Sequence, residues 1–217
     1  MSEFFDEVDE EVRREQLKKL WDRYNWLIVS VAILIVAAVG GWRAYQYWQN
    51  KQAVAAGAQF EAALKLSEEN KHTEAEEAFN KVAATAPSGY RMLARFQAAA
   101  EIVARDKPAA VKAYDALAAD TSLGQTERDL AQLRASALLV DTAPYAEIKQ
   151  RLEPLSGQDR TFHHSARELL ALSAWHGNDS AATRQWIDLI TTDSDTPASL
   201  RARIESLKAL LPPAAKS

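Results

Sequence analysis

The sequence predicts an all-α protein in which a single N-terminal transmembrane helix is followed by an array of α-hairpins with a C-terminal capping helix. Three observations predict this class. The segment from Asn25 to Trp42 contains no charged residue. The rest of the chain is rich in alanine and poor in β-branched residues, a composition that suits closely packed helices better than sheets. Finally, a pattern of small and aromatic residues recurs there with a period of 33–36 residues.

Residues 25–48 are predicted to be a transmembrane helix bounded by aromatic belts. Between Trp26 and Trp42 only Ser30 has a polar side chain. This stretch gives roughly 26 Å of helix, just enough for a hydrocarbon core. Aromatic residues crowd both ends, where their amphipathic rings favour the headgroup layers. The residues expected to anchor the chain in the bilayer are Trp26, Leu27, Ile28, Val29, Val31, Ile33, Leu34, Ile35, Val36, Val39 and Trp42.

The flanking basic residues predict the orientation of this helix. Arg43 and Lys51 are the only bases shortly after it, whereas five precede it: Arg13, Arg14, Lys18, Lys19 and Arg23. The excess of bases places the N-terminus in the cytoplasm and the residues after about 48 outside it, in the periplasm of a Gram-negative inner membrane. A cleaved signal peptide is the alternative. The long, net-acidic leading region and the lack of a closing A-x-A site favour a retained anchor.

Residues 1–24 are predicted to form a charged cytoplasmic head. The apolar residues of a helix over residues 8–24 lie loosely along one side of it: Val8, Val12, Leu17, Leu20, Trp21 and Tyr24. Such a helix either lies on the membrane surface, contacts a cytoplasmic partner or is a solvated stem. The solvated stem is favoured because the apolar stripe is broken.

Residues 49–211 are predicted to form one exported helical domain, and residues 212–217 a disordered tail. Residues 49–217 contain 20 basic and 22 acidic side chains, which gives no electrostatic reason to expect nucleic acid as a partner. The chain has no cysteine, so disulfides, cysteine-metal sites and thiol catalysis are excluded. The domain must therefore be held together by packing alone.

An internal repeat organises this domain. The spacing Ala75-x3-Phe79-x2-Val82 recurs as Ala110-x3-Tyr114-x2-Leu117 and as Ala182-x3-Trp186-x2-Leu189, and these residues are expected to pack the repeats. A small residue lets two helices approach closely, and the aromatic residue one turn later fills the groove to the next pair. The glycines follow the same period, because Gly89, Gly124 and Gly157 fall where loops between repeats are expected.

The pattern predicts a helix for each part of the repeat. A long helix runs out of the membrane to about Ser67, and the others are expected at 72–85, 90–105, 108–119, 126–140, 143–155, 162–176 and 179–191. A closing helix over 197–211 is expected to begin with Thr196 as N-cap and Pro197 at the first helical position. Leu200, Ile204 and Leu207 then lie on one face, as a capping helix requires.

Catalytic and metal chemistry are not predicted. Neither a G-x-S-x-G turn nor a glycine-rich phosphate loop occurs, so no catalytic residue, cofactor or small-molecule substrate is expected. His163 and His164 are adjacent and should point about 100° apart on a helix, which disfavours one shared ion. His164 and Glu168 stand at i and i+4, yet the sequence suggests no third ligand. No metal site is therefore predicted.

Several aromatic residues are candidates for partner binding. Tyr90, Phe96, Tyr145 and Trp175 are either core residues or anchors in a peptide groove. For Trp175 and Trp186 the core is favoured, since both stand at helical spacing with other large apolar residues.

The repeat resembles the tetratricopeptide repeat in a degenerate form. Ala63, Ala75, Phe79 and Pro87 stand at the small, small, aromatic and proline positions of that repeat, whereas Gln59 and Ala62-Ala63 replace its tryptophan and leucine-glycine signature. The whole chain resembles the YfgM family of bacterial inner-membrane proteins. This likeness rests on FFDEVDEEVRREQLKKLWDRYNWLI, WRAYQYWQNKQ and AEEAFNKVAATAPSGYRMLARFQAA.

The resemblance implies a non-enzymatic ancillary subunit of the SecYEG translocon, with the membrane-anchored chaperone PpiD and exported polypeptides as partners. The physical interpretation is compatible with this role, because a tethered helical array offers a concave surface to a peptide or a helix. Two alternatives have the same fold. One is an adaptor for another envelope complex, such as cytochrome maturation machinery, and the other is a regulator that acts through its cytoplasmic head.

Overall fold

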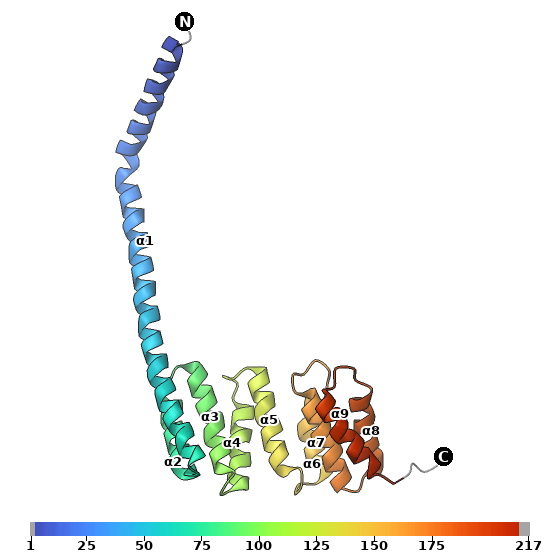
Figure 1. The fold of residues 1–217 in the computed structure, drawn as a ribbon. Helices are drawn as coiled ribbons and strands as arrows, with labels where there is room; N and C mark the ends of the chain where they lie inside the picture. The colour runs from blue at the N-terminus through green and yellow to red at the C-terminus, as the bar shows by residue number, and fades with distance from the viewer. Residues whose placement is uncertain (1–2, 213–217) are drawn as a thin grey trace. The chain divides into compact units, whose positions relative to one another are not determined.

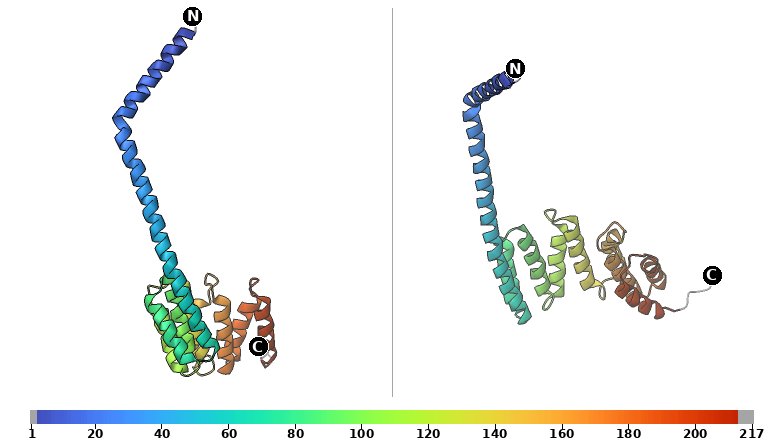
Figure 2. Two further views of the ribbon diagram at one scale, coloured as in Figure 1. Left: turned by 60° about the vertical axis from the view of Figure 1, so that its left-hand side comes forward. Right: turned by 45° about the horizontal axis from the view of Figure 1, so that its top comes forward.

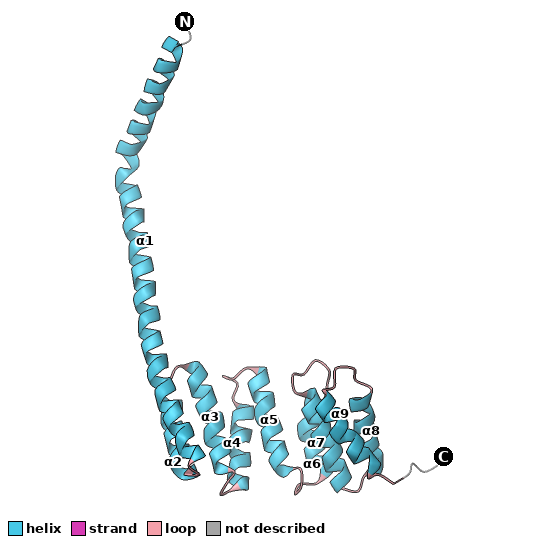
Figure 3. Ribbon diagram, viewed as in Figure 1, coloured by secondary structure: helices cyan, strands magenta, loops and turns pink. Residues whose placement is uncertain are grey.

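The computed structural model describes the backbone of residues 3–212, together with the side chains of Lys18 and residues 21–212. Every regular element of residues 3–212 is helical, as the sequence predicts (Figures 1 and 3). The chain divides into two compact units, Met1–Val54 and Ala55–Ser217. Four residues of the predicted apolar stripe of the head, Val8, Val12, Leu17 and Leu20, and the predicted tail from residue 213 lie outside these described parts, whereas Trp21 and Tyr24 of the stripe are exposed.

The first unit is formed by the N-terminal part of helix α1 (Glu3–Glu68). Its described segment is long and apolar enough, by length and composition, to cross a membrane. All eleven predicted anchor residues have large side-chain exposure, from 46% at Ile28 to 73% at Trp26. Ser30 donates its hydroxyl to the Trp26 carbonyl at 2.7 Å, so its one polar group is satisfied within the helix. The surface of this segment therefore suits contact with lipid.

The second unit contains the end of α1 and eight further α-helices within its described residues (Figure 2). Consecutive helices form antiparallel neighbours joined by short loops. Their bounds lie within three residues of the predicted ones. They are α2 (His72–Thr85), α3 (Ser88–Ile102), α4 (Lys107–Ala119), α5 (Gln125–Leu139), α6 (Tyr145–Leu152) with the 3-10 turn η1 (Glu153–Leu155), α7 (His163–His176), α8 (Ser180–Thr191) and α9 (Ala198–Ala209).

Three core clusters succeed one another along this unit. The first joins the end of α1 to α2 and α3 around the fully buried Phe79, which meets Phe60 edge-on with ring centroids 5.2 Å apart. The second joins α3, α4 and α5 around Tyr114 and Leu117. The third joins α6, α7, α8 and α9 and is built mainly from larger aliphatic residues such as Ile148, Leu170 and Ile190. Each helix thus buries its apolar face against its chain neighbours, as in a repeat array.

The first two copies of the repeat pack as the sequence predicts. Ala75 and Ala110 are completely buried, and the aromatic residue one turn later is buried beside each of them. Polar contacts also follow the period. Arg151 in α6 donates to Asp115 in α4, 36 residues earlier, at 2.8 Å. Ser67 donates to Glu101, 34 residues later, at 2.6 Å. Equivalent positions of successive repeats are therefore neighbours in space.

The third copy departs from the predicted register. Trp186 is buried, but Ala182 is only half-buried and Leu189 is 46% exposed. Thr183, Ile187 and Ile190, each one residue later than the predicted position, are buried instead. Thr183 tolerates burial because its hydroxyl donates to the Asp179 carbonyl at 2.7 Å. The assignment of Ala182 and Leu189 to repeat packing is therefore wrong by one residue.

Helix α9 covers the third cluster, as expected of a capping helix. Leu200, Ile204 and Leu207 are buried there, and Leu211 packs beside them. The predicted start of this helix is wrong, because Pro197 rather than Thr196 is the N-cap. The buried Thr196 hydroxyl donates to the Ile190 carbonyl at 2.7 Å, which satisfies the end of α8 rather than the start of α9.

Candidate interaction groove and polar cluster

A hollow of about 380 Å³ lies between helices α3 and α5. Its size is within the range that accommodates a ligand or a large side chain. It is lined by Met92, Leu93, Phe96, Gln97 and Ala100 of α3, Tyr114 of α4, Thr126, Glu127, Leu130 and Arg134 of α5, and Phe162 before α7. We refer to this hollow as the α3–α5 groove.

Local packing explains why this face of α3 remains open. Ala94 and Ala98 of α3 are buried in the first core cluster, and Ala99 is buried in the second. Alanine at these positions brings the neighbouring helices close to those faces of α3, whereas Leu93 stands on a face that they leave open. Leu93 is consequently 47% exposed. An exposed leucine within a mostly apolar hollow is suited to contact with another apolar surface.

The wall of the groove combines aromatic and charged groups. The rings of Phe96 and Tyr114 lie 6.3 Å apart between centroids, and Tyr114 is almost completely buried. Burial raises the pKa of the Tyr114 hydroxyl, so this ring remains neutral. Glu127 and Arg134 add one charge of each sign. The arrangement can hold an apolar side chain and orient the polar backbone beside it.

The structure separates the four predicted partner-binding aromatics. Phe96 alone among them lines the α3–α5 groove. Tyr90 packs against the first core cluster with its ring 5.9 Å from Phe60. The Tyr145 hydroxyl accepts a 2.8 Å hydrogen bond from the Trp186 indole, and Trp175 packs against the third cluster. Leu93, Leu130 and Phe162 also line the groove and were not singled out from the sequence.

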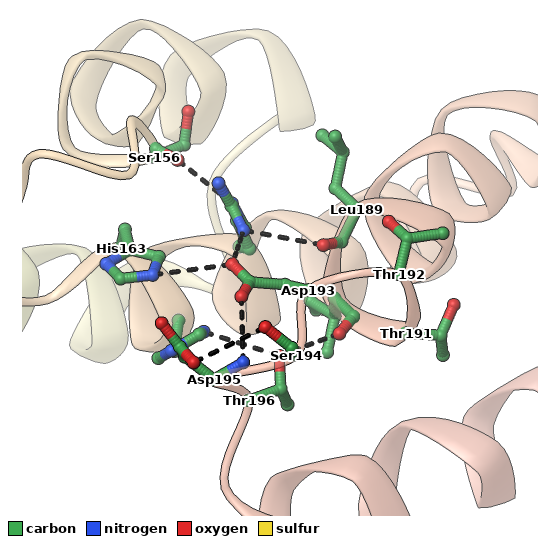
Figure 4. A network of polar contacts seen from close by, with 12 residues as sticks. Ser156, His163, Leu189, Thr191, Thr192, Asp193, Ser194, Asp195 and Thr196 are labelled. Carbon is green, nitrogen blue, oxygen red and sulfur yellow. Dashed lines mark hydrogen bonds and ion pairs between the residues drawn. The ribbon is translucent and has the colours of Figure 1, made fainter.

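A second candidate feature is a polar cluster at the start of α7 (Figure 4). Arg167 is 5% exposed and donates to the Ser156 carbonyl at 2.9 Å and to Asp193 Oδ2 at 2.8 Å. The Asp195 backbone N–H donates to Asp193 Oδ1 at 3.1 Å. The hydrogen bonds from the Asp195 backbone and from the Arg167 side chain hold the pKa of Asp193 below its usual range. The cluster ties η1 and α7 to the α8–α9 loop.

The two adjacent histidines converge in this cluster. Their ring centroids are 3.9 Å apart, so the predicted divergence of their side chains is wrong. Both rings are half-buried, and one atom each of His163, His164 and Asp193 lie within 4.8 Å of one another. Partial burial, together with the nearby His163, lowers the pKa of His164, which favours its neutral form. Neutral imidazole is the form that binds metal ions.

The chain is similar to a known family of helical repeat domains. A family model described as "Tetratricopeptide repeat-like domain" matches residues 18–170, well over half of the chain. Neither a curated protein nor a solved structure matches the chain in the corresponding searches. The matched region includes the first two core clusters and the α3–α5 groove. Arrays of this type present side chains of successive helices to protein partners. The chain belongs to the tetratricopeptide repeat-like domain family.

Proposed function

We propose that this protein is a membrane-anchored interaction scaffold whose α3–α5 groove binds an unfolded segment of an exported polypeptide. The observation that carries the proposal is the mostly apolar hollow that contains the exposed Leu93. A mostly apolar hollow with a few polar groups on its wall is the usual form of a binding site on a protein surface.

The chemistry of the groove favours an extended segment with a large apolar side chain. Phe96, Leu130 and Phe162 offer apolar contacts, and Gln97 and Thr126 offer hydrogen-bonding groups for a peptide backbone. Charges of both signs stand on the wall, so no strong preference for acidic or basic segments is expected. Low selectivity of this kind suits a protein that meets many different chains.

The N-terminal helix supplies the location. We infer that residues 25–48 span the bacterial inner membrane with the N-terminus in the cytoplasm, so that residues 49–211 work in the periplasm. The support is the apolar composition of this segment and the excess of basic residues before it. Tethering raises the effective concentration of the groove near other membrane complexes.

The resemblance to the YfgM family extends the proposal to a partner. It favours an ancillary role at the SecYEG translocon, beside a PpiD-like membrane-anchored chaperone. A groove that holds emerging apolar segments would protect them from aggregation before they fold.

Site-specific photo-crosslinking in living cells tests this function. A photoreactive residue replaces Leu93, and a matched control replaces Leu210, which is also exposed but lies after α9. Adducts from position 93, and not from position 210, to exported chains and translocon subunits would support the proposal. Adducts to a different envelope complex would identify another partner and favour an adaptor role. Equal labelling from both positions would contradict a binding role for the groove.

A further inference from the structure

We propose that His163, His164 and Asp193 form a binding site for one divalent transition-metal ion, with Zn²⁺ as the best-suited probe. The site would join the first turn of α7 to the α8–α9 loop. Two imidazoles and one carboxylate are a common ligand set for zinc, with the fourth position open to water.

The spacing of the donor atoms fits this ion. His163 Nε2 lies 3.6 Å from Asp193 Oδ2, too far for a hydrogen bond. Two ligands at about 2.1 Å from a tetrahedral Zn²⁺ are about 3.4 Å apart, close to this separation. All three donor atoms lie within 4.8 Å of one another, so a modest rotation of the half-buried His164 side chain closes the site.

Hydrogen bonds orient His163 for metal binding. Its Nδ1 lies 2.6 Å from the Arg160 carbonyl oxygen, which only accepts, so Nδ1 carries the proton and donates. The lone pair of the neutral ring is then on Nε2, which faces Asp193. A backbone carbonyl that fixes the second nitrogen of a histidine in this way is the usual support of a metal-binding imidazole.

The same reasoning gives the tautomer of His164. Its Nδ1 makes a long, 3.5 Å contact with Thr196 Oγ1. The Thr196 hydroxyl proton is already donated to the Ile190 carbonyl at 2.7 Å, so Oγ1 accepts from His164. With Nδ1 protonated in both rings, the Nε2 lone pairs are the ones left for a ligand.

Two acidic and two basic side chains surround the site. Arg167 donates to Asp193 Oδ2 and opposes a bound ion, but its guanidinium is also engaged by two backbone carbonyls. Arg201 also donates, to the Asp193 backbone carbonyl at 3.1 Å, so the charges of Asp193 and Asp195 balance those of the two arginines. Asp193 Oδ2 has a second lone pair, so it can accept from Arg167 and bind a metal at once.

Zinc titration of the full chain in nanodiscs tests the site. Isothermal calorimetry at pH 7.5 should detect one Zn²⁺ per wild-type chain. His163→Asn and His164→Asn should each weaken the affinity at least tenfold. His72→Asn and His176→Asn are matched controls, since these residues contact Glu101 and Asp141 instead, and both should bind like the wild type. Zinc binding undiminished in both the His163 and His164 variants would overturn the proposal.

Spectroscopy then checks the ligands independently of affinity. X-ray absorption of the zinc-loaded protein should show two imidazole ligands, and His164→Asn should reduce this to one. Circular dichroism of each variant should match the wild type, because His164 is half-buried and outside the core clusters. The absence of zinc binding by the correctly folded wild type would also overturn the proposal.

Discussion

Asn70 and Asn178 have the same left-handed backbone conformation, with φ of 59° at both, although 108 residues separate them in the chain. This distance equals three periods of 36 residues. The backbone hydrogen bonds around them are also the same. Lys71 N–H donates to the Leu66 carbonyl, and Asp179 N–H donates to the Ala174 carbonyl, each at 2.9 Å. Both helices thus end in a Schellman turn, which marks the equivalent position of two repeats.

The first prediction follows from these two turns. Asn70→Gly and Asn178→Gly should leave the free energy of unfolding unchanged or slightly higher, because glycine adopts positive φ without strain. Asn70→Val and Asn178→Val should each lower it by about 1–2 kcal/mol. Urea denaturation followed by circular dichroism measures the difference. As a control, Asn80→Ala on the exposed face of α2 should not destabilise, since alanine is favoured within a helix.

The second prediction concerns the buried Arg167. Arg167→Ala should lower the free energy of unfolding by about 3–5 kcal/mol, because it leaves the Asp193 carboxylate without its buried partner. Arg203→Ala is the matched control, since Arg203 pairs with Glu168 but its side chain is 59% exposed. That change should cost about 1 kcal/mol or less. Thermal and urea denaturation compare the two variants, and equal losses would contradict the role assigned to burial.

The third prediction is a pH dependence at Asp120. Hydrogen bonds from the Ser122 hydroxyl and backbone N–H, and then from Arg95, lower the pKa of Asp120 to about 2 from 3.8. A lowered pKa means that this group stabilises the fold above pH 4 and loses that contribution as the pH falls toward 2. Asp120→Asn should therefore be less stable than the wild type at pH 6, and the difference should vanish near pH 2. A constant difference across this range would contradict the assignment.

The fourth prediction tests the α3–α5 groove and depends on the proposed function. Leu93→Asp should reduce partner adducts formed by a photoreactive residue at position 96 at least tenfold, because it places a charge in the apolar hollow. Leu93 is about half exposed, so the melting temperature should change little. Leu210→Asp is the control and should leave both adducts and stability unchanged. Unaltered crosslinking in Leu93→Asp would exclude the groove as the binding surface.

Much of the fold was predictable because proline and glycine residues mark where several helices begin. Pro87, Gly124 and Pro144 are the N-caps of α3, α5 and α6, and Pro108 stands in the first turn of α4. Each of these residues limits where a helix begins, whatever packs against it. The predicted register of the last copy was wrong because no such loop residue fixes which of its side chains are buried. Its buried position is Thr183, whose polarity hides it from a pattern based on small and apolar residues.

The candidate sites were less predictable because they depend on distant segments. The α3–α5 groove brings Leu93 and Leu130 together with Phe162, and no local spacing connects the three. The prediction that the two histidines diverge was wrong because it left out side-chain torsions. The 100° rule describes the directions of the Cβ atoms, whereas two further torsions bring the His163 and His164 rings to 3.9 Å.

The core clusters differ in composition, and this difference affects the local stability of the helices around them. The cluster shared by α3, α4 and α5 contains three alanines among its five buried residues, whereas the last cluster is built mainly of leucine and isoleucine. An alanine buries less apolar area than a leucine or isoleucine, so each buried residue of the former cluster contributes less to stability. Its amides should exchange with deuterium before those of α7 and α8. The α3–α5 groove thus lies beside the cluster that is expected to open more readily of the two.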